Sequence, residues 1–514
     1  MDKFSIPTCS AIFQSRVEYK DASDFFLPDF AQSSARVISA DGFSYVSNVI
    51  FEDGFLKFTL NTTVKVAYLS EQNGYIKSVF FPFSKEKSLE VRGISGEDAL
   101  PDVCAVCVYA CAKQKSPRNF EITVGNHVNA SIYSKNDVAV FNPEGVSDAE
   151  LHSEKITASE HGLFFDYPES VSFETPIDEN MPHIAEIADS SLILSVENSY
   201  ISGEKIKYRA KASLSCVFRG QNAVDSEESA ANYVYFSKDF PFEGSFDAIC
   251  VPESAQVLTK LTLLEYDCSS LFDPYGESRI IGVNMRYSVK SDVFFSVEKE
   301  FSDDGYSPLY ECTSKSETYS YERLSDAFEE KCTISGALRY DSVPLVSINS
   351  HQAQILPSGV EVSDDKLFFT GKLYVTVCGT DEKGEARFVS GSIPVRAPIQ
   401  SSVLPANKKF FTECSLLFCD AVLQNGEISI NAEIYLKCVA VEKAKIIALS
   451  DFEVNYDSPK QMRKNEYVLY YPDENDTLWS IGKKYEVPVS VIKSENSMES
   501  DVIKGRKVIK IPMK

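Results

Sequence analysis

Three cysteines lie close together at a spacing that could suit a metal ion. Cys104, Cys107 and Cys111 form a Cys-x2-Cys-x3-Cys run, whereas a tetrahedral zinc site needs four ligands and commonly takes them from two spaced pairs. The run lies in an apolar stretch with the composition of a strand, where an odd spacing puts Cys104 and Cys107 on opposite faces. The nearest histidine in the sequence is His127. We therefore expect buried thiols that pack in a core.

The histidines show no local pattern of catalysis or metal binding. The chain has five, namely His127, His152, His161, His183 and His351. None lies four residues from another, and no Gly-x-Ser-x-Gly elbow or phosphate-binding glycine loop occurs. Surface positions are expected for His152 and His161, and solvated turns for the acidic pairs Asp303-Asp304 and Asp364-Asp365. The sequence therefore predicts no enzyme activity, no metal and no cofactor, with an enzyme in the acidic body as an alternative that turnover would reveal.

Charge and hydropathy limit the kinds of partner and the cellular location that we expect for this chain. The 514 residues carry a formal net charge of −24, and all of it lies before the last fifty residues. An acidic body disfavours nucleic acid or an anionic membrane surface as a partner. The N-terminus, Met1 to Ser5, lacks the pattern of a signal peptide, and the longest apolar run, Val103 to Ala112, is about half as long as a membrane span. We expect no transmembrane segment, a cytoplasmic location and reduced thiols.

The last fifty residues carry the densest local structural signals. Asp476 and Thr477 are residue types that cap the start of a helix. Leu478 and Ile481 follow at helical spacing. Between them lies Trp479, the one tryptophan of the chain, which we expect to fill a small core. The sequence thus predicts a capped amphipathic helix directly after residue 477.

A second helix and a strand are predicted after this helix. Pro488 to Ile492 has the pattern of a short helix that ends near Asn496. Gly505 precedes an alternating run, residues 507–512, in which one face of a strand is buried. A further strand is expected before the first helix, and Pro472 occupies a position in it, which limits that strand to an edge of the sheet or shortens it. The predicted order is strand, helix, helix, strand.

This order resembles the LysM domain, a small βααβ module. The resemblance is carried by the Asp-Thr-Leu-Trp-x-Ile core, the Asn after the second helix and the Gly-x-x-Val-x-x-Ile-Pro ending. Members bind N-acetylated glycans in a shallow groove between the loop after the first strand and the loop before the last. The resemblance implies a groove formed by Asn475, Asp476, Thr477, Leu478, Ser497, Met498, Ser500, Val502 and Ile503. Alternatively, Leu478 and Ile503 belong to the core and Asp476 is only a cap.

The body contains an internal repeat. One eight-residue pattern, with Asn as its second residue, occurs at Val128–Lys135, Val283–Lys290 and Ile430–Lys437. Each copy is preceded by a two-part strand signature and then by a residue pair at a proline, Phe81-Pro82, Phe240-Pro241 and Ile393-Pro394. Apolar residues alternate with polar ones in these units, as in half-buried strands. The chain is therefore predicted to be mainly β, with three tandem sandwich-like repeats followed by the small βααβ module.

The expected divisions follow from these repeats. They are an N-terminal extension at 1–29, repeats at 30–170, 171–335 and 336–459, a basic linker at 460–466 and the LysM-like module at 467–514. Helices are predicted at two places in the body, Val146 to Lys155 and Asp326 to Lys331.

The body is similar to the spore-coat-associated SPOCS domain family of endospore-forming bacteria, which occurs in tandem and often ends in a LysM domain. The marks of this similarity are the Asp-Gly pairs at Asp41-Gly42 and Asp53-Gly54, the strand-then-proline segments and the motif Asp304-Gly305-Tyr306-Ser307-Pro308. The resemblance implies a non-enzymatic adaptor of the spore envelope in the mother cell. Its LysM module would dock to a coat morphogenetic protein or to glycan at the forespore surface, and its repeats would recruit coat proteins. The alternative is a peptidoglycan-binding cell-wall protein outside the cell.

Overall fold

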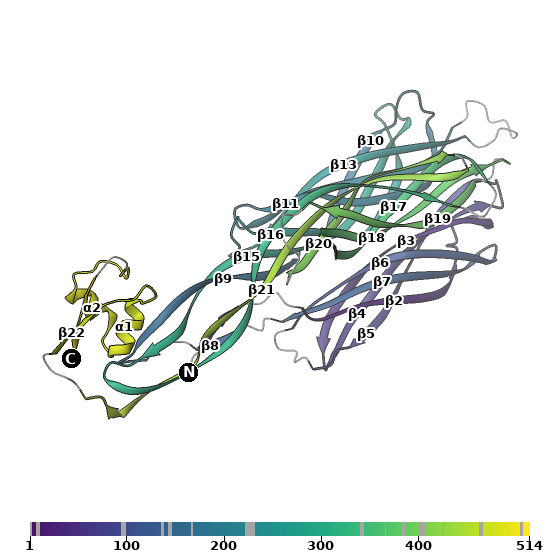
Figure 1. Cartoon of the computed structure of the whole chain (residues 1–514). Coiled ribbons are helices and arrows are strands. Elements are labelled where there is room, and N and C mark those ends of the chain that lie inside the picture. Colours follow the sequence, from purple (N-terminus) through teal and green to yellow (C-terminus); the bar gives the residue numbers. More distant parts are fainter. Residues whose placement is uncertain are drawn as a thin grey trace.

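Long antiparallel strands make up most of the computed structural model (Figure 1). The structure describes residues 3–6, 11–93, 99–134, 138–141, 146–165, 168–221, 232–339, 344–364, 366–382, 386–400, 408–424, 426–461, 466–503 and 507–513. Two short helices, α1 (Leu478–Tyr485) and α2 (Val489–Glu495), lie near the C-terminus. Within these ranges no helix combines the length and the apolar character that crossing a bilayer requires.

Six sheets pack in pairs as three sandwiches, numbered in chain order. The first joins the sheet β2 (Ala11–Phe26), β7 (Asn119–Ser134), β6 (Ala99–Ser116) to the sheet β3 (Ser34–Glu52), β4 (Phe55–Ser70), β5 (Ile76–Glu90). The second joins β10 (Glu169–Pro176), β15 (Ser278–Tyr306), β14 (Gln256–Phe272) to β11 (Ile184–Ile201), β12 (Lys205–Gly220), β13 (Tyr233–Asp247). The third joins β16 (Tyr310–Leu338), β21 (Glu427–Pro459), β20 (Lys408–Gln424) to β17 (Leu345–Ser363), β18 (Lys366–Asp381), β19 (Ala386–Ile399). The three sandwiches together are called the head.

The period-two pattern in the sequence is the pattern of burial in these sheets. In β12, Ile206, Tyr208 and Ala210 are buried, and the residues between them are more exposed. They share one core with Ile281 and Val283 of the facing sheet. Burial of alternate side chains fixes the register, since a slip of one residue would turn the apolar face to water.

The repeated Asn patterns mark equivalent central strands of the three sandwiches. Asn129 lies on β7, Asn284 on β15 and Asn431 on β21. Each side-chain oxygen accepts a hydrogen bond from the neighbouring edge strand: from Arg16 Nε at 2.9 Å, from Ser172 Oγ at 2.6 Å and from Ser335 Oγ at 3.0 Å, respectively. The repeat predicted from the sequence thus corresponds to a repeated strand with a repeated contact.

Buried lysines connect the sandwiches to one another. Lys65 of the first donates to the Ser190 carbonyl of the second at 2.6 Å and lies 2.7 Å from the Asp189 carboxylate. Burial alone would lower the pKa of Lys65, but the charges of Asp189, Tyr266 and Asp41 together outweigh burial and hold the pKa above its ordinary value. Lys437 of the third donates to the Ser199 carbonyl of the second at 3.3 Å. Removal of one partner would leave a buried charge uncompensated, which is costly.

Three strand ribbons leave the head and form a stalk. They are β1 (Lys3–Ile6) with β8 (Val138–Phe141), β9 (Glu150–Phe165) with the second half of β15, and the first half of β16 with the second half of β21. Ala158, Phe301 and Tyr321 meet in one shared apolar core, and Phe141 and Phe452 in another. Figure 1 shows the stalk narrowing from the head to the helical tail at its tip.

The prediction of two helices in the body is wrong. Residues 326–331 lie within β16, and residues 150–155 begin β9. The charged run Asp326 to Lys331 favours a helix locally, but its backbone pairs residue by residue with β21, from Ala440 to Tyr435. Long-range pairing and burial of Phe328 against the third core override the local preference.

The strand pairings also move the expected divisions of the body. Residues 11–26 are no extension, because β2 pairs with β7 along its whole length. β9 belongs with β15 and β16 belongs with β21, so the divisions fall before residues 150 and 310 and not near 170 and 335. A single sequence does not reveal partners that lie about 150 residues apart. Most of the basic linker, residues 462–465, lies outside the described residues.

Candidate functional site

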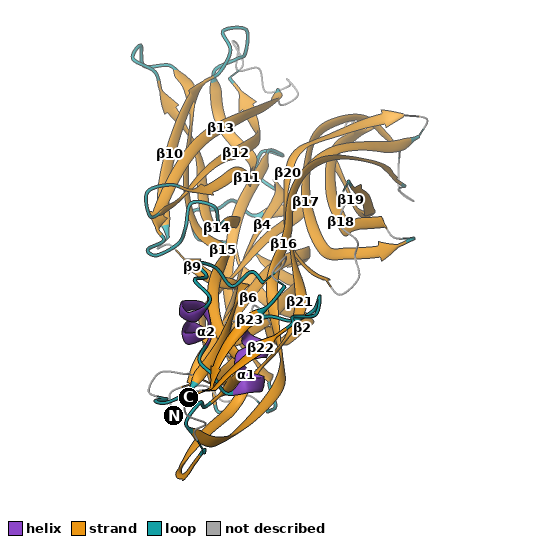
Figure 2. Ribbon diagram, turned by 60° about the vertical axis from the view of Figure 1, so that its left-hand side comes forward, coloured by secondary structure: helices purple, strands orange, loops and turns teal. Residues whose placement is uncertain are grey.

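The tail has the βααβ order predicted from its sequence. β22 (Glu466–Tyr470) pairs antiparallel with β23 (Ile509–Met513), and α1 and α2 lie between them in the chain. β22 ends at Tyr470, so Pro472 lies after this short strand and not within it as expected. Gly505, predicted to open the last strand, lies outside the described residues. Figure 2 shows both helices beside β22 and β23 at the narrow end of the molecule.

Reciprocal hydrogen bonds fix the start of α1. Thr477 is the N-cap, and its hydroxyl accepts from the Ser480 amide at 3.0 Å. The Ser480 hydroxyl lies 3.0 Å from the Thr477 amide, which donates to it. This capping box satisfies amides that the first helical turn leaves without partners. The predicted cap is confirmed, and the Thr477 hydroxyl is thereby engaged within the tail.

Asp476 also has a structural role. Its carboxylate accepts from the Asp473 amide at 2.8 Å and from the Tyr470 hydroxyl at 2.7 Å. These two bonds hold the pKa of Asp476 below its ordinary value, and the same carboxylate raises the pKa of Tyr470 to about 12. Asp476 therefore shapes the loop after β22.

The apolar residues proposed for the groove lie mostly inside the tail. Leu478 is 1% exposed and Met498 is 9% exposed, and both belong to the tail core with Ile481 and Ile509. Ile503 packs partly against this core. Leu478 and Met498 therefore offer almost no surface to a ligand, as the alternative interpretation of Leu478 predicts.

The exposed part of the predicted groove is formed by two loops. Asn475 and Thr477 are exposed in the first loop, and Ser497, Ser500 and Val502 in the second. These residues, with the loop backbone, are the surface that a glycan could contact, and we call them the loop face. Backbone amides and small polar side chains suit the acetamide of an N-acetylated sugar, and Val502, which is 67% exposed, offers apolar contact.

Asn496 anchors the start of the second loop. Its side-chain amide donates to the Ile492 carbonyl at 2.8 Å and to the Lys510 carbonyl at 2.6 Å. Its oxygen accepts from the Lys510 amide at 2.8 Å. The Asn after the second helix thus ties the end of α2 to β23.

The tail docks onto the tip of the stalk through residues of α1 that lie outside the tail core. Trp479 is only half-buried and lies outside the tail core, so the expectation that it fills that core is wrong. Its indole Nε1 donates to Asp304 at 3.0 Å, and its ring lies 5.0 Å from the rings of Tyr306 and His152. We call these stalk residues, Asp304, Tyr306 and His152, the seat.

Charge and close packing strengthen this contact. Lys483 Nζ lies 2.6 Å from the Asp304 carboxylate. Burial alone would raise the pKa of Asp304, but the hydrogen bonds from Lys483, Trp479 and the Gly305 amide, with the Lys483 charge, together outweigh burial and hold the pKa below its ordinary value. The Tyr306 hydroxyl donates to the Val487 carbonyl at 2.9 Å. Gly482 permits this approach, because a Cβ there would lie 2.7 Å from the Tyr306 hydroxyl oxygen.

Docking leaves the loop face open. The seat takes Trp479, Lys483 and Val487, while Asn475 and Ser500 stay exposed in the docked chain. The acidic pair Asp303-Asp304, expected in a solvated turn, instead lies within β15, and Asp304 is bonded to the tail. Its role in the seat depends on a contact between residues 175 apart, which no local signal reveals.

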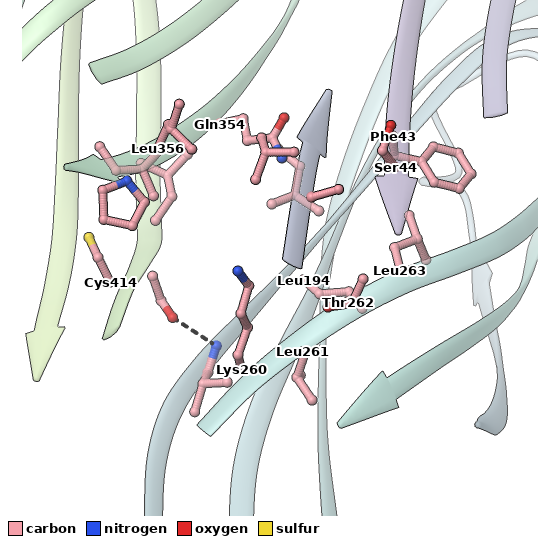
Figure 3. Close-up of a pocket in the computed structure, with 18 of the residues that line it drawn as sticks. Phe43, Ser44, Leu194, Lys260, Leu261, Thr262, Leu263, Gln354, Leu356 and Cys414 are labelled. Atoms are coloured by element: carbon pink, nitrogen blue, oxygen red, sulfur yellow. Dashed lines mark hydrogen bonds between the residues drawn. The ribbon is translucent and has the colours of Figure 1, made fainter. Parts of the chain in front are cut away.

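The head contains a cavity of about 190 Å³ where the three sandwiches meet. Figure 3 shows the Lys260 side chain pointing into it from β14. Glu413 and Cys414 of β20 also line the cavity, and burial raises the pKa of both groups. A protonated thiol is a poor nucleophile, so Cys414 is not an activated nucleophile.

The cysteines and histidines singled out in the sequence are dispersed. Cys107 is buried, which raises the pKa of its thiol to about 12, whereas Cys111 is exposed, contrary to the expectation of uniformly buried thiols. His161 is not a surface residue: its side chain is 4% exposed, stacks on Phe294 and lies 2.9 Å from Asp292. Cys107 and His161 thus pack within the head, whereas His152 lies in the seat beside Trp479.

Comparison with known proteins identifies only the tail. A model of the LysM domain matches residues 474–512. The uncharacterized protein YkzQ of Bacillus subtilis (strain 168) is 40% identical over 45 residues, which are 9% of this chain and 60% of that protein. The chain thus covers less than two thirds of the curated relative it matches. No solved structure matches the chain. The tail is a LysM domain, which suggests binding of peptidoglycan or a related glycan.

Proposed function

We propose that the chain is a non-enzymatic adaptor of the bacterial cell envelope whose LysM tail binds a peptidoglycan-type glycan. The observation that carries this proposal is the open loop face of a LysM domain held at the tip of a stalk. A domain in this position meets a surface before the broad head does. The head then remains free for other contacts.

The loop face supports a glycan as the ligand. Asn475, Ser497 and Ser500 are exposed, small and polar, and Val502 adds an apolar contact. Bound sugars need hydrogen bonds at their acetamide and hydroxyl groups together with apolar contact along the ring. The exposed acidic residues Glu474 and Glu499 beside these loops favour a glycan without added anionic groups.

The finer proposal places this adaptor on the developing spore, with the head recruiting coat proteins. Its support is the thrice-repeated strand pattern followed by a LysM domain, which resembles the SPOCS arrangement. In this proposal the protein stays in the mother cell, and the tail docks to a coat morphogenetic protein or to glycan at the forespore surface. The competing proposal is a cell-wall protein that binds peptidoglycan outside the cell.

A sedimentation assay on purified peptidoglycan tests the glycan. The full chain should co-sediment and should be competed off by N-acetylglucosamine oligomers. Ser500→Arg puts a bulky charge on the loop face and should weaken binding at least tenfold. Tyr467→Ser is the matched control, because Tyr467 is exposed near the far end of β22, away from both loops. Equal binding by all three proteins, or none by the wild type, would reject the proposal.

Location separates the finer proposal from its competitor. A fluorescent fusion of the full chain should form a shell at the forespore surface during sporulation. Diffuse signal throughout sporulation would reject the spore adaptor, and signal over the wall of vegetative cells would support the competitor. The Ser500→Arg fusion then reports whether the loop face is needed for that location.

A further inference from the structure

Three metal-ligand groups converge on the stalk beside the docked tail. A ring nitrogen of His152 and one carboxylate oxygen each of Glu154 and Asp303 all lie within 4.8 Å of one another. His152 and Glu154 come from β9 and Asp303 comes from β15. The sequence gives no sign of this cluster, because its two parts lie about 150 residues apart.

The pairing of β9 with β15 explains the convergence. His152 and Glu154 are two residues apart on one strand, so their side chains share a face. The register shifts between Ser302 and Asp304, which leaves Asp303 as the extra residue of a bulge. Bulges re-aim side chains, and here His152 Nδ1 lies 2.6 Å from the Asp303 carboxylate.

The cluster has more acidic groups than basic ones, which favours the binding of a cation. Two carboxylates face one imidazole, and the nearest docked lysine, Lys483, is paired with Asp304 and not with the cluster. Among the described residues the Glu154 carboxylate has no hydrogen-bond or ion-pair partner, and it is exposed, so its side chain can rotate inward. The His152–Asp303 pair therefore satisfies only part of the site.

We propose that His152, Glu154 and Asp303 bind a divalent transition-metal ion of the zinc class, with water completing its coordination. Imidazole and carboxylate ligands suit such ions. In a tetrahedral site with bonds of about 2.0–2.2 Å the ligand atoms lie about 3.4 Å apart. His152 Nδ1 and the Asp303 oxygen, now 2.6 Å apart, would therefore separate as the ion enters between them, and Glu154 would turn inward.

The tail supplies a readout. Trp479 is the single tryptophan of the chain, and its ring lies 5.0 Å from that of His152. A paramagnetic ion at the site lies close enough to quench this indole. Metal-free full chain titrated with Co²⁺ should lose Trp479 fluorescence in a saturable, one-to-one manner, and Zn²⁺ should restore it by displacing Co²⁺. Calorimetry with Zn²⁺ measures the same binding without the fluorophore.

Variants decide the assignment. His152→Asn should lower the affinity for Zn²⁺ at least tenfold by calorimetry, and Glu154→Gln and Asp303→Asn should each lower it as well. The matched control is His183→Asn, because His183 pairs with Glu277 at 3.4 Å in the second sandwich without belonging to the cluster. Retained binding in His152→Asn, equal loss in His183→Asn, or no saturable binding by the wild type would overturn the proposal.

Discussion

The two faces of the tail differ in what they contact. The α1 face carries the most conspicuous residue of the sequence, Trp479, and is used within the chain, against Asp304 and Tyr306. The loop face carries inconspicuous residues such as Ser500 and stays exposed. The difference teaches that a half-buried tryptophan in a binding module can serve the attachment of the module, while binding is left to small polar groups and backbone. Variants that damage one face and spare the other test this comparison.

The largest effect is expected where both faces depend on one residue. Leu478→Ala removes a side chain that is 1% exposed in the tail core and should destabilise the tail by about 2–5 kcal/mol. Seat contacts and glycan binding should fail together, while the far-ultraviolet signal of the head persists. Denaturant unfolding followed by Trp479 fluorescence measures the loss. Val502→Ala, at an exposed position, is the control and should stay within about 0.5 kcal/mol.

Trp479→Ala should separate the two faces. Because the indole contacts the stalk and not the tail core, the tail should stay folded but dock more weakly, by about 2 kcal/mol or more. Limited proteolysis near residue 461 should accelerate, and sedimentation with peptidoglycan should persist. If glycan binding disappears with docking, the two faces are not independent.

Acid should weaken docking through Asp304. Its pKa is lower in the docked state than its ordinary value, so the carboxylate favours docking at pH values above about 4, and this contribution is lost as pH falls through the docked pKa. Trp479 emission should therefore shift toward that of exposed indole in acid. Asp304→Asn should dock more weakly at pH 7, by about 1.5 kcal/mol, and should lack the acid step.

The neighbouring imidazole requires its own control in this titration. His152 lies beside Trp479 and can change its emission independently of docking. The His152→Asn variant should keep the acid step assigned to Asp304. An acid step that follows His152 and survives in Asp304→Asn would contradict the assignment.

The smallest effect is expected from the Tyr306 hydroxyl. Tyr306→Phe keeps the ring beside Trp479 but removes the donor to the Val487 carbonyl, which should cost about 1 kcal/mol of docking free energy. Hydrogen exchange of α1 in the full chain measures the change. Glycan binding should be unchanged, and a loss there would show that the loop face depends on the seat.

The tail was largely predictable because local signals determine it. Thr477 as a cap, Asn496 after α2 and the order of elements depend on residues within a few positions of one another. The partner of Trp479 was not predictable, because it lies on a strand 175 residues earlier. The motif containing Asp304 was visible in the sequence, but its role depends on the three-dimensional arrangement of the stalk.

The sequence allowed the β-sandwiches of the body to be predicted, but not the strand ribbons that extend from them as the stalk. Alternating burial gave strands and sandwiches, and the Asn repeats marked equivalent strands. The stalk was missed because β9 and β16 leave the sandwiches and pair over long distances with β15 and β21. A charged segment such as Asp326 to Lys331 has a local helix preference that only its distant partner overrides.

Hydrogen exchange on the full chain with and without N-acetylglucosamine oligomers tests the central claim most directly. The account predicts added protection at residues 473–478 and 497–503 on binding, while residues 303–307 and 479–487 keep the protection that they have without ligand. Ligand protection confined to the seat, or release of the seat on binding, would contradict it.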